Sequence, residues 1–249
     1  MTDQPCLQVA GVGKRYGGLE ALTGISLQVP DGVRQAILGP NGAGKTTLFK
    51  ILSGEIAPSS GTVAFRGRDI TTAPSYRRAA LGIARTFQVT TLFPRLTVLQ
   101  NVILAVQGIR RTKYIAWRVV EGLGALLAQA RQILEQVGLA GREAAPVDSL
   151  AYGEQRQLEI GLALASRPSL LLLDEPTAGL ARAEVARIVA LLQGLPRAIT
   201  ILFIEHDMDV AFALAETVTV LSQGQMIAEG PLEAIRANRL VQEIYLGEL

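Results

Sequence analysis

Nine consecutive residues near the start of the chain have the types and the spacing of a phosphate-binding loop. They are Gly39, Pro40, Asn41, Gly42, Ala43, Gly44, Lys45, Thr46 and Thr47, and they fit the pattern G-x-x-x-x-G-K-[ST]. An apolar run over residues 33–38 precedes them and a helix-like segment over residues 47–52 follows, which is the context that the pattern requires. The sequence therefore predicts a nucleotide-binding loop.

Each residue type in this loop suits the binding of a triphosphate. Backbone N–H groups at the start of a helix attract negative charge, and glycines let the backbone curl without Cβ clashes. The Lys45 ammonium can reach the β- and γ-phosphates, and the Thr46 hydroxyl can coordinate Mg²⁺. The alternative is a glycine-rich turn that binds nothing, and the flanking strand and helix disfavour it.

Three polar residues that follow apolar strands are candidates for chemistry on the nucleotide. Asp174 and Glu175 follow residues 170–173, and His206 follows a strand predicted over residues 199–204. Asp174 can orient a metal shell, Glu175 can polarise an attacking water, and His206 can contact a γ-phosphate. Taken alone, Asp174 and Glu175 could also be a salt-bridged strand end, and His206 could be a structural histidine. Functional residues gather at such strand ends in open α/β sheets.

Gln88 and Tyr16 are two further candidates. Gln88 ends a strand predicted over residues 82–87, and its amide oxygen can coordinate Mg²⁺. Tyr16 follows the first predicted strand, and its ring can stack on a purine with a contribution of about 1–3 kcal/mol. The respective alternatives are an ordinary polar strand end and a half-buried tyrosine.

Length and composition describe a globular chain. It has 249 residues, 49% of them hydrophobic and 18% charged, which favours one α/β domain with an inserted subdomain. The single cysteine excludes an internal disulfide, and the single histidine excludes a His/Cys zinc cluster. A net charge of +2 argues against a nucleic-acid partner. Without an apolar membrane span or a secretory signal, the chain is expected to stay in the cytoplasm.

The order of predicted elements indicates a mostly parallel sheet with two additions. Strands predicted over residues 7–12 and 21–29 form an N-terminal antiparallel β element. Residues 91–157 repeat apolar positions at helical spacing and form a helical insertion. The rest of the single domain, residues 1–90 and 158–249, forms the catalytic core together with the β element.

A second glycine-containing helix start lies near the end of the insertion. Residues 149–157 read Ser-Leu-Ala-Tyr-Gly-Glu-Gln-Arg-Gln and lead into a helix predicted over residues 158–165. This helix start is another potential anion site. A monomer that binds one nucleotide has no obvious use for it.

These motifs together resemble the nucleotide-binding subunit of an ATP-binding cassette (ABC) transporter over nearly the whole chain. The matching segments are an A-loop at Tyr16, Walker A at residues 39–46, a Q-loop at Gln88, a signature at residues 150–154, Walker B at residues 170–174, Glu175, and a switch at His206. The resemblance implies a RecA-like P-loop NTPase that hydrolyses ATP. Catalysis would use Glu175, His206 and Gln88, while Thr46, Gln88 and Asp174 would hold Mg²⁺.

The resemblance also implies partners. Two such subunits would pack head to tail, so that Ala151, Gly153 and Glu154 of one signature face the ATP on the Walker A loop of the other. Two transmembrane permease subunits and a periplasmic or extracellular substrate-binding protein would complete the transporter. The chain would then be peripheral on the inner face of the cell membrane.

Four segments resemble one ATPase subunit of the branched-chain amino acid importers. They are residues 85–88, the Leu-Ala-Tyr-Gly of the signature, residues 204–208 and residues 245–248. This implies uptake of a hydrophobic amino acid or a similar small molecule. The rivals are the ATPase of a lipid or lipopolysaccharide exporter and a soluble ABC ATPase acting on DNA or ribosomes, which the chain length disfavours.

Three positions depart from the family's pattern. Ala151 replaces the common signature serine, Ala181 replaces an Asp or Asn at the end of the D-loop, and Leu162 replaces a frequent arginine. One lost hydrogen bond costs about 0.5–1.5 kcal/mol, so we expect coupling to be tuned rather than abolished.

Overall fold

The computed structural model describes residues 4–86, 92–108 and 123–246, which form two compact units. Unit 1 comprises residues 1–85, 169–176 and 196–249, and unit 2 comprises residues 86–168 and 177–195. The expected single domain with an insertion over residues 91–157 stays a prediction. The structure extends unit 2 past residue 157: it includes the whole of α6 at Tyr152–Leu164, which begins inside the expected insertion, and α7 at Arg182–Gly194.

The first sheet of unit 1 is the predicted antiparallel β element. Its strands lie in the order β2-β1-β4-β5, with β1 at Leu7–Tyr16, β2 at Leu19–Val29, β4 at Ser60–Phe65 and β5 at Arg68–Asp69. In β1, Leu7 and Val9 are buried while Gln8 and Ala10 are exposed, so one face of the strand packs on the core. The register shifts after Val9, where Gly11 has a φ of 62°.

The second sheet of unit 1 has the order β10-β9-β3-β8-β7-β6 and is parallel except for its terminal hairpin. Its strands are β3 at Arg34–Leu38, β6 at Ile83–Arg85, β7 at Leu170–Asp174, β8 at Thr200–Ile204, β9 at Thr217–Ser222 and β10 at Gln225–Pro231. Every residue of β3, β7 and β8 is buried, as expected for strands covered on both faces. This confirms the predicted α/β fold with a mostly parallel sheet.

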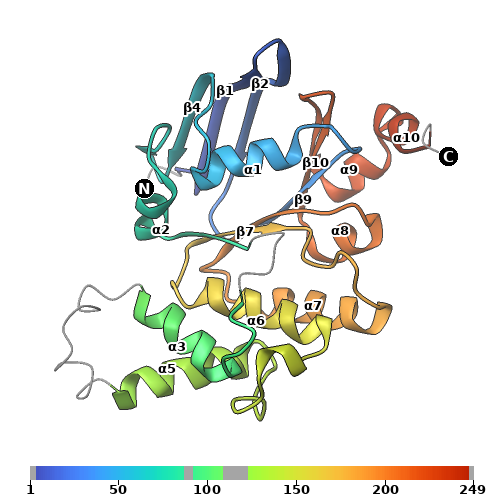
Figure 1. Cartoon of the computed structure of the whole chain (residues 1–249). Helices are drawn as coiled ribbons and strands as arrows, with labels where there is room; N and C mark the ends of the chain where they lie inside the picture. The colour runs from blue at the N-terminus through green and yellow to red at the C-terminus, as the bar shows by residue number, and fades with distance from the viewer. Residues whose placement is uncertain (1–3, 87–91, 109–122, 247–249) are drawn as a thin grey trace. The chain divides into compact units, whose positions relative to one another are not determined.

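Helix α1, at Lys45–Ser53, joins the two sheets through the hydrophobic core. Leu48, Phe49, Ile51 and Leu52 are fully buried on this helix and pack among side chains from both sheets. Figure 1 shows α1 beside the strands of the first sheet, with β7 of the second sheet on its other side. The helix ends at Gly54, whose φ of 78° is favourable for glycine.

Four shorter helices complete unit 1. They are α2 at Ser75–Leu81, α8 at Met208–Leu214, α9 at Leu232–Arg236 and α10 at Arg239–Leu246. Helix α8 begins at Asp207, whose carboxylate accepts hydrogen bonds from the N–H groups of Asp209 and Val210.

Unit 2 is helical in the described residues. Its elements are α3 at Val98–Gly108, α5 at Leu123–Gln136, a 3₁₀ turn at Val147–Ser149, α6 at Tyr152–Leu164 and α7 at Arg182–Gly194. Thr97 and Gln100 exchange hydrogen bonds that cap the start of α3, and Gly161 lets α6 approach Ile133 and Val137 of the α5 segment closely. None of the helices in the described part of the chain has the length and apolar character that a bilayer crossing needs.

Candidate functional site

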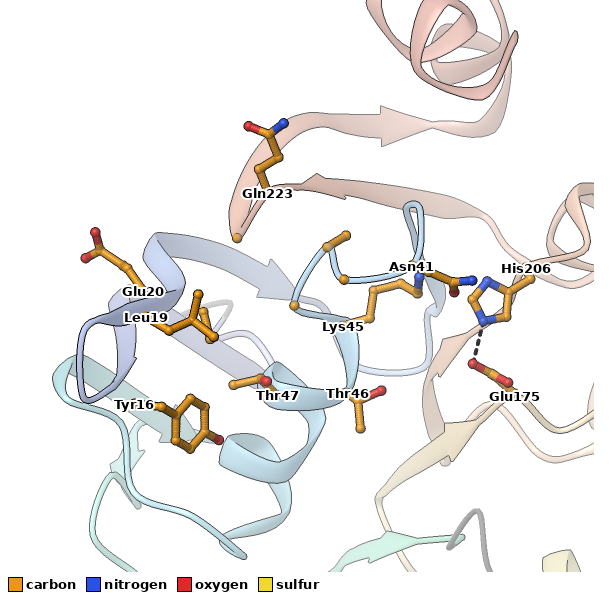
Figure 2. A pocket seen from close by; sticks show the side chains of 15 residues that line it. Tyr16, Leu19, Glu20, Asn41, Lys45, Thr46, Thr47, Glu175, His206 and Gln223 are labelled. Carbon is orange, nitrogen blue, oxygen red and sulfur yellow. Dashed lines mark hydrogen bonds and ion pairs between the residues drawn. The ribbon is translucent and has the colours of Figure 1, made fainter. Parts of the chain in front are cut away.

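A cavity of about 540 Å³ lies among residues of unit 1, at the carboxyl ends of strands in the parallel sheet (Figure 2). Strands β3, β8 and β7 are neighbours, so the segments that follow them meet at one edge of the sheet. The lining comprises residues 41–47 after β3, Glu175 after β7, His206 after β8, residues 16 and 19–21 of the first sheet, and the turn at Gln223 and Gly224.

The backbone of the phosphate-binding loop has the conformation that its glycines were expected to permit. Gly39, Gly42 and Gly44 have φ values of 148°, 80° and 98°. A Cβ at Gly39 would overlap the carbonyl oxygen of Leu221, and one at Gly44 would lie 2.8 Å from that of Ala21. Gly44 immediately precedes α1, so the loop ends at a helix N-terminus, where N–H groups can bind phosphate oxygens.

The Lys45 side chain lies inside the curl of this loop. Its ammonium donates hydrogen bonds to the carbonyl oxygens of Gly39 and Pro40, the latter at 2.9 Å. The residue is only 6% exposed, yet it lines the cavity together with Thr46 and Thr47 (Figure 2). Phosphate oxygens of a nucleotide could replace these carbonyl partners with stronger, charge-assisted hydrogen bonds.

The turn between β9 and β10 holds the loop from the opposite side. The Gly224 N–H donates to the carbonyl of Ala43 at 3.2 Å, and the Gly224 carbonyl accepts from Thr23 at 2.8 Å. Gln223 and Gly224 both have positive φ values, 48° and 75°, as in a tight hairpin turn. The place of this turn in the site depends on the pairing of β9 with β3, which no local pattern of the sequence reveals.

Glu175 and His206 meet across neighbouring strand ends. His206 Nε2 lies 2.5 Å from Glu175 Oε1, and the two side chains are 43% and 21% exposed (Figure 2). Glu175 has a φ of 50°, an uncommon conformation for this residue type, and its N–H donates to the carbonyl of Ile204 at 3.1 Å. The chain therefore turns sharply after Asp174, and both predicted catalytic side chains face the cavity.

Asp174 is buried beside this pair. Its Oδ2 accepts a hydrogen bond from Arg85 Nη2 at 2.8 Å, whereas its buried Oδ1 has no hydrogen-bond partner among the described residues. Burial raises the pKa of the Asp174 carboxyl, and the hydrogen bond from Arg85 opposes that rise. The free oxygen suits a divalent cation or one of its water molecules.

Tyr16 lines the cavity at the end of β1 and is 46% exposed (Figure 2). The Lys14 ammonium lies 5.2 Å from the centre of its ring. An aromatic ring that remains open to solvent beside the phosphate loop is available to stack on a base. Leu19, 67% exposed, and Glu20 lie on the same side of the cavity, and the sequence analysis had not singled them out.

The signature residues belong to unit 2, whereas the cavity belongs to unit 1. Ala151 precedes α6, and its N–H donates to the Glu154 carboxylate at 3.0 Å. The Gly153 N–H donates to Glu184 Oε1 at 3.2 Å, and Glu184 Oε2 accepts from Ala181 at 3.0 Å. One carboxylate thus supports the first turns of both α6 and α7, whose N-cap residues are alanines. Gln88 lies outside the described residues.

Arg85 is a buried side chain of this site to which the sequence analysis gave no role. It was noted only as part of the segment before Gln88. One sequence feature could have pointed to it: Arg85 is a cation at the end of a predicted strand. In a parallel sheet that strand can lie beside the strand that ends at Asp174. The pairing of β6 with β7 had to be known before that contact could be predicted.

A glycine-curled loop before a helix, with acids and a histidine on adjacent strand ends, defines a P-loop nucleotide-binding protein. A family model described as ABC transporter matches residues 22–178, and one described as branched-chain amino acid ATP-binding cassette transporter matches residues 225–248. The chain therefore belongs to the ABC transporter family. It is an ATP-binding and ATP-hydrolysing subunit of such a transporter.

Relatives and solved structures agree with this membership. The high-affinity branched-chain amino acid transport ATP-binding protein BraF of Pseudomonas aeruginosa is 37% identical over 254 residues, which cover 98% of this chain and 99% of BraF. The corresponding LivG protein of Escherichia coli is 36% identical over 256 residues, covering 98% and 99%. A nucleotide-free ATP-binding cassette from an ABC transporter superimposes with a TM-score of 0.84 at 30% identity, covering 96% of this chain and 98% of that one.

Proposed function

We propose that this ATPase powers the import of branched-chain amino acids or of similar small hydrophobic molecules. The relatives that match over their full length bear that substrate in their names, and a family model of the same description matches the C-terminal residues 225–248. The observation that carries the hydrolytic part of the proposal is the Glu175–His206 pair, which faces the phosphate loop in one cavity.

Within that cavity, each residue would have a defined role. Lys45 and the N–H groups of residues 41–47 bind the phosphates, and Tyr16 stacks on the base. Glu175 accepts the proton of the attacking water, and His206 contacts the γ-phosphate. The contact between His206 Nε2 and Glu175 Oε1 keeps these two groups side by side in the cavity.

The chain offers oxygen ligands that suit Mg²⁺ in this site. The orphaned Oδ1 of buried Asp174 and the Thr46 hydroxyl are hard donors of the kind Mg²⁺ prefers, and Gln88 is assigned to the same shell. A bound Mg²⁺ would neutralise charge on the phosphate oxygens.

The complete catalytic site would be shared between two subunits. Ala151, Gly153 and Glu154 begin α6, and the Gly153 N–H already binds a carboxylate oxygen, that of Glu184. We assign this helix start to the γ-phosphate held by the partner subunit. A solved ATP-binding cassette in a dimeric post-hydrolysis state with ADP and Pi resembles this chain with a TM-score of 0.76 at 26% identity, covering 91% of this chain and 98% of that one.

The partners that follow are a second ABC ATPase subunit, identical or different, two transmembrane permease subunits and, indirectly, a periplasmic or extracellular substrate-binding protein. We expect no nucleic-acid partner, since the net charge is only +2. With these permeases the chain would lie on the inner face of the cell membrane.

Reconstitution tests this function. The chain is co-expressed with candidate permease and binding-protein subunits of a branched-chain amino acid importer. Uptake of labelled leucine into vesicles is then measured, with ATP supplied on the side of the membrane that carries the ATPase. We expect ATP-dependent uptake that Lys45→Ala abolishes. ATPase activity stimulated by nucleic acid, without any co-purifying membrane protein, would contradict the proposal.

A further inference from the structure

Arg85 joins the buried carboxylate of Asp174 to the partly exposed carboxylate of Glu55 in unit 1. Its Nη2 donates to Asp174 Oδ2 at 2.8 Å, and its Nη1 donates to Glu55 Oε1 at 2.5 Å. The same Nη1 lies 3.1 Å from the Ser53 hydroxyl. The Arg85 side chain is 7% exposed and that of Asp174 is fully buried, so the contact between these two is an interior ion pair rather than a surface one.

The network uses the two oxygens of Asp174 unequally. Arg85 binds Oδ2, while Oδ1 is buried and lacks a hydrogen-bond partner among the described residues. Buried carboxylate oxygens in folded proteins are almost always hydrogen-bonded or bound to a cation. One oxygen of this side chain is therefore held in place, and the other remains available to a ligand.

Helix α1 links the cavity to the Arg85 network. Its first turn carries Lys45 and Thr46, which line the cavity, and the segment at its C-terminal end supplies Ser53 and Glu55 to Arg85. The Phe49 ring, on the same helix, lies 6.0 Å from the Arg85 guanidinium carbon. Glu55 thus fixes Arg85, and Arg85 fixes Asp174.

We propose that Arg85 is a positioning residue of the magnesium site, which holds Asp174 through Oδ2 so that Oδ1 faces the metal ion or one of its water molecules. This rests on the assignment of Asp174 to Mg²⁺ under the proposed function. The plainer reading is that Arg85 only fastens β6 to β7 and α1.

The fork of the guanidinium is essential to this role. Two different nitrogens of Arg85 reach the two carboxylates. A lysine has one ammonium nitrogen and cannot bind both carboxylates in the same geometry. Arg85→Lys therefore keeps the positive charge and removes the positioning. Arg85→Met is a poorer test, because it also removes a charge that repels the metal ion, and the two effects oppose one another.

The test measures the affinity of the full chain for a non-hydrolysable ATP analogue by calorimetry, once with Mn²⁺ and once with EDTA. The ratio of the two affinities reports the metal site without requiring turnover. We expect Arg85→Lys to reduce this ratio by about fivefold or more, while the affinity in EDTA changes less than about twofold, because fork geometry is lost and charge is kept. An unchanged ratio in a folded variant would overturn the proposal.

Three further variants separate the possible outcomes. Glu55→Gln leaves Asp174 and Arg85 in contact and should reduce the ratio by a smaller factor than Arg85→Lys does. Because Glu55 is partly exposed, this variant also tests the proposal if Arg85→Lys does not fold. Arg66→Lys changes an exposed ion pair with Asp31 and should leave the ratio unchanged. Asp174→Asn should remove most of the gain in affinity that Mn²⁺ gives over EDTA.

The Asp174→Asn result distinguishes the two proposals. If it reduces the ratio and neither Arg85→Lys nor Glu55→Gln does so, only the positioning role is wrong. If it leaves the ratio unchanged, the assignment of Asp174 to the metal is wrong, and the role of Arg85 fails with it. A loss of thermal stability without a change in the ratio supports the plainer reading.

Discussion

Glu175 combines an unusual backbone conformation with a side chain aimed into the cavity. A φ of 50° is uncommon for a residue with a Cβ and costs on the order of 1 kcal/mol or more. The hydrogen bond from its N–H to Ile204 helps to hold this conformation. In this conformation the Glu175 carboxylate lies beside His206, whereas Asp174, the last residue of the strand, is buried.

Glu175→Gln tests the assigned general base. The amide keeps the shape of the side chain but cannot accept the proton of water, so turnover should fall by about 100-fold or more. Nucleotide affinity should stay within a few fold of the original, because Lys45 and the loop N–H groups are untouched. Steady-state ATPase assays and nucleotide titration give the two numbers.

The matched control is Glu20→Gln, the same change at a residue that lines the same cavity away from His206. It should keep most of the turnover. Full hydrolysis by Glu175→Gln would refute the assignment of this residue.

Cys6 is the single thiol of the chain and is fully buried. Burial raises its pKa, so the folded chain holds less thiolate at pH 8 than an unfolded chain does. We expect a thiol reagent to label the native protein slowly at pH 8, and to label one group rapidly in denaturant. Rapid labelling of the native chain at pH 8 would show that Cys6 is accessible.

The raised pKa of Cys6 also makes the free energy of unfolding depend on pH. The neutral thiol stabilises the fold, and this contribution is lost as the pH rises through the raised pKa.

At the scale of elements, helix α1 is held at both ends. Its N-terminus follows the glycine loop, and its C-terminal carbonyls meet Arg78, a side chain only 1% exposed. The guanidinium donates five hydrogen bonds, to the carbonyl oxygens of Ile51, Leu52, Ile70, Thr71 and Ala73. Burial lowers the pKa of Arg78 to about 10, so the group is still charged at pH 7. Its positive charge interacts favourably with the negative, C-terminal end of the α1 dipole.

Arg78→Met should therefore destabilise unit 1 strongly. Several buried carbonyls would lose their donors, which should cost about 3 kcal/mol or more in the free energy of unfolding. For a chain of this length, about 3 kcal/mol corresponds to a fall of roughly 6–12 °C in Tm. Calorimetry measures it, and Arg77→Met at the exposed neighbouring position is the control, expected to change Tm little. Equal Tm values for the two variants would contradict the structural role of Arg78.

At the scale of the whole molecule, the nucleotide cavity and the signature belong to different units of the chain. The cavity is lined by the glycine loop that follows β3, whereas Gly153 lies in the first turn of α6, where its N–H donates to Glu184. Under the shared-site proposal, a lone chain can bind nucleotide but lacks the partner's signature for hydrolysis.

The specific ATPase activity should consequently fall on dilution. We expect it to decrease towards zero as dimers dissociate, with a midpoint at the dimer dissociation constant measured by sedimentation. Nucleotide binding should persist in the same range. Constant specific activity at concentrations where only monomers sediment would contradict a site completed by residues 150–155 of another subunit.

Much of the fold could be predicted, because its signals are local. The apolar run before Gly39 predicted a buried strand, and the glycines that follow predicted a loop and helix. The elements that were missed are short or lack periodicity, such as β5 and α9. Tyr16, Asp174, Glu175 and His206 were recognised one by one, since each belongs to a motif or a strand end.

The sequence by itself determined the chemistry of the loop from Gly39 to Thr47, because residue type and spacing specify which backbone shapes and charges are available there. Only the tertiary structure decided which residues share the site. Strand order brought Gly224 over the loop, His206 against Glu175, and Arg85 against Asp174. These contacts join residues from 31 to 181 positions apart, and such long-range contacts depend on how strands pair, which no local pattern encodes.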